Sequence, residues 1–262
     1  MSRVLLKLGG SVITDRAAEY PKVRSAALTR LAREIAAAHP DQLVVVHGAG
    51  SFGHPIVART GIDKGVRDLR GRLAWAETQC WQNVLNVEIA ATLGRAGLPA
   101  VPLQASAIAV MSGGRLRRLD LTVLRGLLDA GMIPVLYGTP AWDKAQGCSI
   151  LSGDVLAPYI AHKLGLDFVV HATDVNGVYD ADPHADPEAA TFPLVSRKTW
   201  PLVRRALRRS AMIDVTGGML TKVGELVRWA RRGVRGRIID ANVPDRLRDA
   251  LRGKPVGTLV SW

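Results

Sequence analysis

The sequence predicts an α/β protein, a three-layer α/β/α sandwich around a mainly parallel central sheet. Short, uninterrupted apolar runs alternate with longer segments of helical periodicity along the chain. Such runs are typical of parallel strands that helices cover on both faces. Of the 262 residues, 48% are hydrophobic and 22% are charged, which is typical of a folded globular chain rather than a disordered one. We therefore expect a single domain over residues 1–262.

The expected strands and helices follow one another in a regular order. Strands are expected at residues 4–8, 43–46, 100–103, 133–137, 167–171 and 237–240. Helical spacing of apolar residues, closed by stop signals such as Pro40 and Gly97, predicts the helices between them. They are expected at residues 26–38, 69–96, 119–130, 155–164 and 219–232. Residues 180–187 predict a loop, and residues 146–147 predict a seam between two halves of the chain.

The chain is strongly basic, with 35 Lys and Arg against 23 Asp and Glu and a formal net charge of +12. A positive field draws small phosphorylated substrates toward a cleft. One basic run falls on a single helix face, which we interpret as a solvated surface. It consists of Arg204, Arg205, Arg208 and Arg209. Because no aromatic platform or RNA-binding signature accompanies this run, we expect no nucleic-acid partner.

Other classes of protein are excluded by what the sequence does not contain. No stretch has the length and apolarity of a signal peptide or a membrane span, so we expect a cytoplasmic location and no membrane partner. Cys80 and Cys148 are too few for a disulfide scaffold. No set of His and Cys residues has metal-ligand spacing, so no protein-bound metal site is assigned.

Glycine-rich turns follow expected strands or open expected helices at residues 9–11, 48–53, 152–154 and 217–218. Glycine lets backbone N–H groups approach a phosphate closely, and a helix that begins there adds a favourable dipole. Lys7 and Lys222 flank two of these turns. Two lysines that converge on one phosphoryl group offset the charge that spreads over its oxygens during transfer. The four turns together therefore predict phosphate chemistry.

The turn at residues 48–53 satisfies G-x-G-x-x-G after a strand, but the dinucleotide-binding pattern then requires an acidic residue at the end of a following strand. That region of the chain has helical periodicity instead. A P-loop also fails, because His54 and Pro55 replace the required Lys and Ser or Thr. The turn is therefore interpreted as a concave set of backbone N–H donors, followed directly by the imidazole of His54. When protonated, His54 can donate a charge-assisted hydrogen bond to a phosphate oxygen.

Asp154 and Asp174 are the acidic candidates of the site. Each follows an expected strand or opens an expected helix. Either carboxylate can orient a lysine or contact a hydrated Mg²⁺ ion. Helix capping explains Asp154 equally well.

Five motifs occur in one order along nearly the whole chain: KLGGS (7–11), HGAGSFGHP (47–55), SGD (152–154), TDVNGVYDADP (173–183) and DVTGGMLTK (214–222). In these motifs the chain resembles the amino acid kinase superfamily. Within it, the histidine that ends GSFGH is similar to that of the isopentenyl phosphate kinases. Fosfomycin kinases, whose acceptor is a phosphonate, share this histidine.

The resemblance implies ATP-dependent, Mg²⁺-assisted phosphorylation of isopentenyl phosphate to isopentenyl diphosphate, a step of isoprenoid biosynthesis in an alternative mevalonate route. It also implies a homodimer. Residues 1–145 are then an N-terminal lobe for acceptor binding and dimerisation, and residues 146–262 a C-terminal nucleotide-binding lobe. A fosfomycin-type phosphonate kinase and a non-catalytic nucleotide-binding regulatory module remain the alternatives.

The resemblance also assigns roles residue by residue. Asp174 and Tyr179 border the nucleoside, and Gly153 closes the acceptor side. Asp154 orients a lysine of the site. The groups at the ATP phosphates are Lys7, Gly9, Gly10, Ser11, Ala49, Gly218 and Lys222. The groups at the acceptor phosphate are Gly48, Gly53 and His54.

One position departs from the pattern of the resemblance. Arg16 stands nine residues after Lys7, where family members usually carry a second catalytic Lys. Arginine keeps the charge but differs in reach and hydration.

The acceptor of such an enzyme has an apolar tail, so the site needs an apolar wall beside its cationic donors. We expect this wall on the long helix at residues 69–96. The candidate residues are Leu73, Trp75, Ala76 and Cys80.

Overall fold

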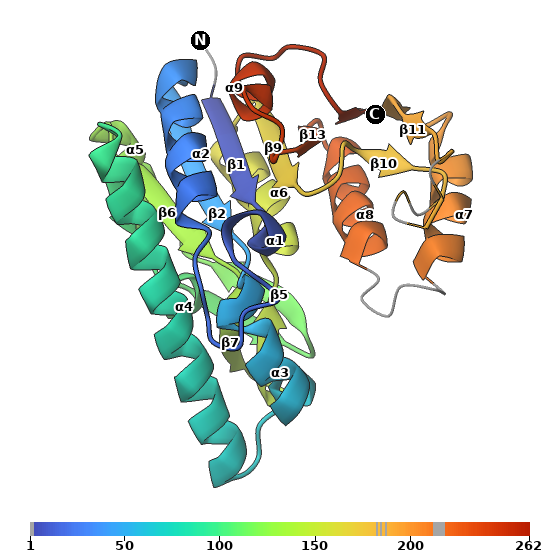
Figure 1. Ribbon diagram of the computed structural model, residues 1–262. Coiled ribbons are helices and arrows are strands. Elements are labelled where there is room, and N and C mark those ends of the chain that lie inside the picture. Colours follow the sequence, from blue (N-terminus) through green and yellow to red (C-terminus); the bar gives the residue numbers. More distant parts are fainter. Residues whose placement is uncertain (1–2, 182, 184, 187, 212–217) are drawn as a thin grey trace.

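The computed structural model describes residues 3–181, 183, 185–186, 188–211 and 218–262, the last two of residues 188–211 without their side chains. Figure 1 shows a central sheet with helices packed against both of its faces. Among the described residues, no helix combines the length and the apolarity that crossing a membrane requires.

The central sheet has eight strands in the order β12-β14-β13-β9-β1-β2-β6-β3. Their bounds are β1 Arg3–Leu8, β2 Gln42–His47, β3 Ala100–Pro102, β6 Ile133–Tyr137, β9 Phe168–Thr173, β12 Leu194–Val195, β13 Arg235–Asp240 and β14 Thr258–Val260. Neighbouring strands are parallel except for the antiparallel pair β13 and β14. The predicted α/β/α sandwich with a mainly parallel sheet is confirmed.

The helices form the two outer layers. Their bounds are α1 Gly10–Ile13, α2 Ser25–Ala38, α3 His54–Thr60, α4 Leu69–Arg95, α5 Thr122–Asp129, α6 Gly153–Leu164, α7 Trp200–Ala211, α8 Gly218–Ala230 and α9 Arg246–Leu251. Three short 3₁₀ helices are η1 Gly50–Phe52, η2 Ile62–Lys64 and η3 Ala105–Ala107.

The alternation of side chains along β1 shows how the layers are built. Leu5 packs in the core that contains residues of α5, α6 and α8, whereas Leu6 and Leu8 pack in the core that contains residues of α2, α4 and α9. Because side chains alternate along a strand, Lys7 lies on the same face as Leu5. The fold therefore directs this lysine toward the layer of α6 and α8.

A second sheet, β5-β4-β7-β8, was not predicted. Its strands are β4 Ala109–Ser112, β5 Arg115–Leu119, β7 Thr139–Asp143 and β8 Gly147–Leu151. The helix expected at residues 119–130 is correct only from Thr122, because residue 119 still belongs to β5. Residues 146–147, expected to be a seam, lie where β7 turns into its antiparallel partner β8. The functions assigned to residues 1–145 and 146–262 stay predictions.

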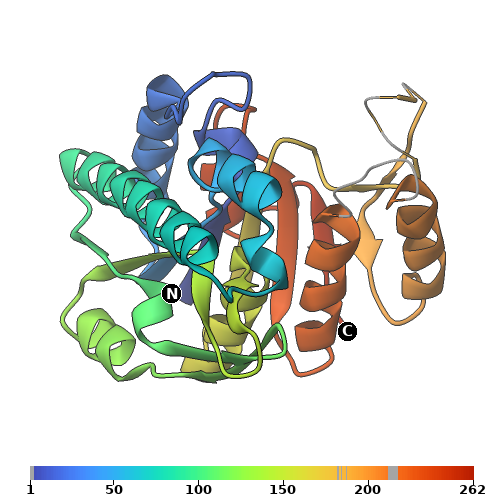
Figure 2. The ribbon, with the colours of Figure 1, turned by 90° about the horizontal axis from the view of Figure 1, so that it is seen from below.

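A small hairpin, β10 (Val178–Tyr179) and β11 (Thr191–Phe192), stands with α7 at one end of the molecule (Figures 1 and 2). The described residues of the loop expected at 180–187 connect the two strands of this hairpin. The arginines of the predicted basic run lie exposed on α7, whereas Val203, Ala206 and Leu207 of the same helix are buried.

Candidate active site

Two glycine turns meet at the carboxyl end of the central strands, where β1 lies between β2 and β9. The contact is between backbones. A Cβ atom on Gly10 would lie 2.5 Å from the nitrogen of Gly50, and one on Gly48 would lie 2.9 Å from the nitrogen of Gly10. These positions have no room for a side chain, which is why both turns are rich in glycine. The amide of Gly9 donates to the carbonyl of Ala172 on β9 (2.8 Å), which ties the first turn to the next strand.

The third turn joins the first two through α6. Ser152 caps this helix by accepting a hydrogen bond from the amide of Asp154 (3.1 Å). A Cβ atom on Gly153 would lie 3.4 Å from the carbonyl oxygen of His47 and 3.6 Å from Cε of Lys7. Gly153 therefore lies against the ends of both β1 and β2.

Lys7, Asp154 and Lys222 form a buried centre at the meeting point of these elements. The Nζ atom of Lys7 lies 3.0 Å from Oδ1 of Asp154. The Nζ atom of Lys222 lies 3.1 Å from each carboxylate oxygen. The two lysines are 6% and 9% exposed, so a single carboxylate holds two buried ammonium groups side by side. The structure thus brings together the two lysines that the sequence singled out, with Asp154 between them.

Burial and charge act in opposite directions in this centre. Burial alone would raise the pKa of Asp154, but the ammonium groups of Lys7 and Lys222 outweigh it and hold that pKa well below 3.8. Burial, followed by the charge of Lys7, lowers the pKa of Lys222 from 10.5 to about 8. The centre therefore holds an ionised carboxylate beside a lysine that titrates close to neutral pH.

His54 and Arg16 form the exposed side of the site. His54 begins α3 directly after Gly53, and Arg16 lies in the segment between α1 and α2. Loss of solvent around the imidazole, followed by the positive charges of Arg16 and Lys7, lowers the pKa of His54 below 6.5. The imidazole is therefore neutral at pH 7 and donates a single N–H. This differs from the protonated donor considered from the sequence.

The remaining predicted residues lie around the same edge of the sheet. Asp174 follows β9 and is exposed, and Tyr179 is half-buried on β10. Ser11 belongs to α1, which begins at the first glycine turn. Ala49 directly precedes η1 in the second turn. Gly218 begins α8, the helix that carries Lys222; residues 214–217 of the last motif lie outside the described residues.

Two residues that sequence reasoning missed support the glycine turns. The hydroxyl of Thr14 donates to the carbonyl of Gly10 (2.7 Å) and accepts from the amide of Ser51 (3.1 Å), so it links the two turns. Gln82 of α4 lies under the second turn, because a Cβ atom on Gly53 would lie 2.6 Å from its side-chain nitrogen. Neither has a sequence signal, since each acts across a contact that only the fold creates.

A third missed residue, His171, has no metal-ligand spacing in the sequence. It is fully buried on β9, and its Nδ1 atom lies 3.5 Å from Oδ1 of Asp154. Burial lowers the pKa of His171 to about 4, so the ring is neutral at pH 7.

The expected apolar wall is wrong for three of its four residues. Leu73, Ala76 and Cys80 lie on the exposed side of α4, whereas Trp75 is half-buried. Trp75 packs against a small apolar cluster that contains Ile56 of α3. The helical periodicity did not reveal the buried face of α4, because much of that face is polar. It includes Thr78, Gln82 and Asn86.

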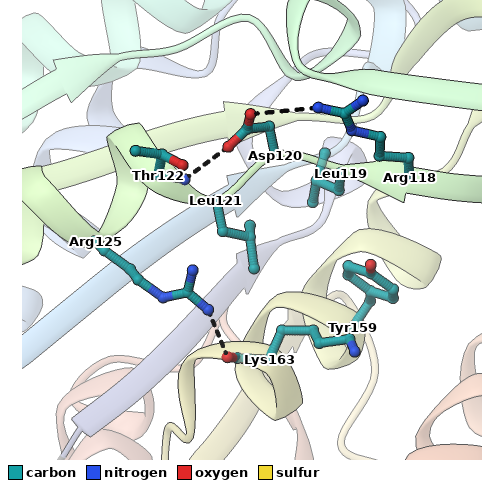
Figure 3. A pocket seen from close by; sticks show the side chains of 8 residues that line it. All are labelled: Arg118, Leu119, Asp120, Leu121, Thr122, Arg125, Tyr159 and Lys163. Carbon is teal, nitrogen blue, oxygen red and sulfur yellow. Dashed lines mark hydrogen bonds and ion pairs between the residues drawn. The ribbon is translucent and has the colours of Figure 1, made fainter.

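A hollow of about 350 Å³ lies elsewhere, between α5, α6 and the end of β5 (Figure 3). Arg118, Arg125 and Lys163 surround it together with Tyr159. Arg118 is paired with Asp120 (3.8 Å), and Arg125 donates to the carbonyl of Lys163 (3.3 Å). None of its lining residues belongs to the glycine turns or the buried centre.

The model of the amino acid kinase family matches residues 2–240. The chain belongs to this family, and the resemblance found in its motifs is confirmed.

Among the relatives of the chain are several proteins named isopentenyl phosphate kinase. The isopentenyl phosphate kinase of Methanothermobacter thermautotrophicus is 38% identical over 98% of each chain. That of Arabidopsis thaliana is 32% identical over 84% of this chain and 73% of its own. A crystal structure of an isopentenyl phosphate kinase superposes with a TM-score of 0.88 and 34% identity, covering 99% of this chain and 100% of the other.

Proposed function

We propose that this protein transfers the γ-phosphoryl group of ATP to isopentenyl phosphate, which gives isopentenyl diphosphate and ADP. The observation that carries the proposal is the buried centre, in which Asp154 holds Lys7 and Lys222 together where the glycine turns meet. Cations fixed in this way stabilise the charge on a phosphoryl group in transfer without reorganising. The full-length similarity to proteins named isopentenyl phosphate kinase supports the choice of acceptor.

The site divides between its two substrates. The first glycine turn (Gly9, Gly10 and Ser11), Ala49 and the start of α8 at Gly218 bind the ATP phosphates together with the two lysines, and Asp174 and Tyr179 border the nucleoside. The acceptor phosphate lies at Gly48, Gly53 and His54, with Gly153 on its far side. Helix starts and glycine turns suit both groups, because their free N–H groups donate hydrogen bonds to anionic oxygens.

The transfer needs no general base. One oxygen of the acceptor phosphate attacks the γ-phosphorus atom, the bond to the β,γ-bridging oxygen breaks, and ADP leaves. The attacking group is already ionised near neutral pH, because phosphate monoesters have a second pKa of about 6. A neutral His54 that donates N–H to the acceptor is therefore sufficient, and Arg16 supplies charge beside it.

Magnesium fits this site as a companion of the nucleotide. Among the described residues no group of three or more His, Cys, Asp or Glu side chains is placed to hold a metal ion, and both oxygens of Asp154 already face Lys222. Mg²⁺ binds readily through substrate phosphates and water with few protein ligands. When bound, it would neutralise charge on the phosphate oxygens, and the exposed carboxylate of Asp174, which directly follows β9, would contact its hydration shell.

The apolar tail of the acceptor fits the cluster beside α3 better than the wall first expected. Ile56, Ile62 and Ala74 form this cluster, with Trp75 and Ile150 packed against it. Since α3 begins at His54, a tail attached to the phosphate at His54 reaches Ile56 and Trp75. The bulk of Trp75 then limits tail length, and Trp75→Ala should extend turnover to longer prenyl phosphates.

An apolar stripe on the exposed side of α4 supports a homodimer formed along that helix. Leu69, Leu73, Val84 and Val87 are 62%, 62%, 54% and 57% exposed, and their spacing places them on one stripe together with Ala76 and Cys80. Replacing Leu73 and Val84 by glutamate should convert a dimer into a monomer in light scattering. An unchanged mass would place the interface elsewhere or leave the chain monomeric.

The function is tested by ADP release with Mg-ATP and a panel of acceptors, with the product identified by mass. The panel is isopentenyl phosphate, dimethylallyl phosphate, geranyl phosphate, fosfomycin, acetylglutamate and UMP. We expect turnover on the prenyl monophosphates only. Turnover confined to fosfomycin would show that the acceptor is a phosphonate and not isopentenyl phosphate. ATP binding without turnover on any acceptor would overturn the proposal in favour of a regulatory module.

A further inference from the structure

His171 is a polar ring in the interior of the central sheet. It lies on β9 between Lys7 of β1 and Ile238 of β13, which are its register partners. It is fully buried. Its strand neighbours Val170 and Ala172 are also fully buried. Burying an imidazole costs free energy unless its polar atoms find partners. If the residue served packing alone, an aliphatic side chain would stabilise the sheet more.

The ring lies beside the carboxylate of the buried centre, which can accept a hydrogen bond from it. Nδ1 of His171 lies 3.5 Å from Oδ1 of Asp154, at the long limit of a hydrogen bond. Neither Nδ1 nor Nε2 completes a hydrogen bond with the residues that the structure describes. The polar interaction that the structure gives this ring is its approach to the carboxylate of Asp154.

We propose that His171 is a positioning residue, which donates its Nδ1–H to Asp154 and so fixes the carboxylate between the two lysines. Asp154 extends from the first turn of α6, and α6 contacts both β1 and α8. Without a donor from β9, the carboxylate is free to rotate toward either lysine alone. This inference rests on the proposed function in that it assigns the lysines to the phosphates of ATP.

The charges around the ring support a neutral donor. The groups that face it are Asp154 from α6, Lys7 from β1 and Lys222 from α8. Burial lowers the pKa of His171 to about 4, whereas Asp154 stays ionised. The proposed bond from Nδ1 to Asp154 therefore needs no titration of the ring in the neutral pH range.

Two matched substitutions test the proposal. His171→Asn removes the ring but keeps an N–H donor at the position of Nδ1, and His171→Leu fills the space without a donor. We expect the Leu variant to lose roughly tenfold in kcat, as for one lost hydrogen bond to a charged group. The Asn variant should stay within about threefold of wild type on the same reasoning. The KM for the acceptor should change in neither, because His54 and its turn do not contact His171.

A second readout separates positioning from simple packing. The thermal midpoint of the Leu variant should equal or exceed that of wild type, since it removes an unsatisfied buried nitrogen. Loss of kcat together with loss of stability in both variants would overturn the proposal, as would a fully active Leu variant.

ATP affinity measured by calorimetry without acceptor keeps this test separate from the choice of acceptor. It should weaken in the Leu variant and not in the Asn variant, even if wild type does not phosphorylate isopentenyl phosphate. If the Leu variant does not fold, the proposal is tested on the wild-type protein instead, by determining the tautomer of the His171 ring with nitrogen NMR. A proton on Nδ1 supports the proposal, and a proton on Nε2 alone overturns it.

Discussion

The two cationic parts of the site differ in where their negative charge comes from. In the buried centre, Lys7 and Lys222 share the carboxylate of Asp154, which the protein itself supplies. On the exposed side, the side chains of Arg16 and His54 make no ion pair or hydrogen bond with the residues that the structure describes. The centre is therefore assembled when the chain folds, whereas under the proposed function a substrate anion completes the exposed side. Substitutions in the centre should change stability and turnover together, and substitutions on the exposed side should change turnover alone.

The largest effect is expected for Asp154→Asn. It leaves two buried ammonium groups without their carboxylate, and removing one partner of a buried ion pair costs about 3–5 kcal/mol. Turnover should fall by on the order of 10³ or more, because both lysines that we assign to the ATP phosphates lose their orientation. Urea unfolding and ADP release measure the two effects. Asp129→Asn, an exposed carboxylate at the end of α5, is the matched control. A stable but inactive Asp154→Asn protein would show that the centre is not needed for folding.

His54→Ala should affect turnover without affecting stability. Losing one preorganised donor costs on the order of 10²–10³ in catalysis, whereas an exposed side chain without partners changes the free energy of unfolding by about 0.5 kcal/mol or less. His54→Asn should recover part of the loss, because the ring is neutral and donates only one N–H. Turnover of the Ala variant within about threefold of wild type would remove His54 from the mechanism.

The pKa of Lys222 predicts that activity and stability respond to pH in opposite directions. Above pH 8 the folded protein loses the proton of Lys222, whereas the unfolded chain keeps it up to 10.5. The unfolded chain then binds more protons, so the contribution of Lys222 to the free energy of unfolding rises between pH 8 and 10.5. Turnover needs the ammonium form and should fall about tenfold per pH unit above pH 8. The free energy of unfolding is measured against pH for wild type and for Lys222→Met, and the variant should lack the rise between pH 8 and 10.5. Parallel pH profiles for the two proteins would contradict the assignment.

The same contrast explains how much of the site could be predicted from the sequence. Lys7, His54 and the glycine turns stand next to apolar strands, so local patterns were enough to find them. The contact between Asp154 and His171 joins α6 to β9 and has no local signature. The sheet β5-β4-β7-β8 was missed for a related reason: β5 reads RLRRL, and only its last residue is fully buried. Its strand character comes from pairing with β4, not from an apolar run.

The smallest effect is expected at Arg16, where the resemblance leads one to expect lysine. Arg16 is exposed and its charge lowers the pKa of His54, so we expect it to act on the phosphate that we assign to His54. Arg16→Ala should cost roughly tenfold in kcat/KM for the acceptor, and Arg16→Lys only about threefold, because the charge is kept and the planar fork is lost. Nuclear magnetic resonance of His54 gives an independent check, since the pKa of its imidazole should rise in the Ala variant and stay low in the Lys variant. An Ala variant with the kinetics and His54 pKa of wild type would place Arg16 outside the site.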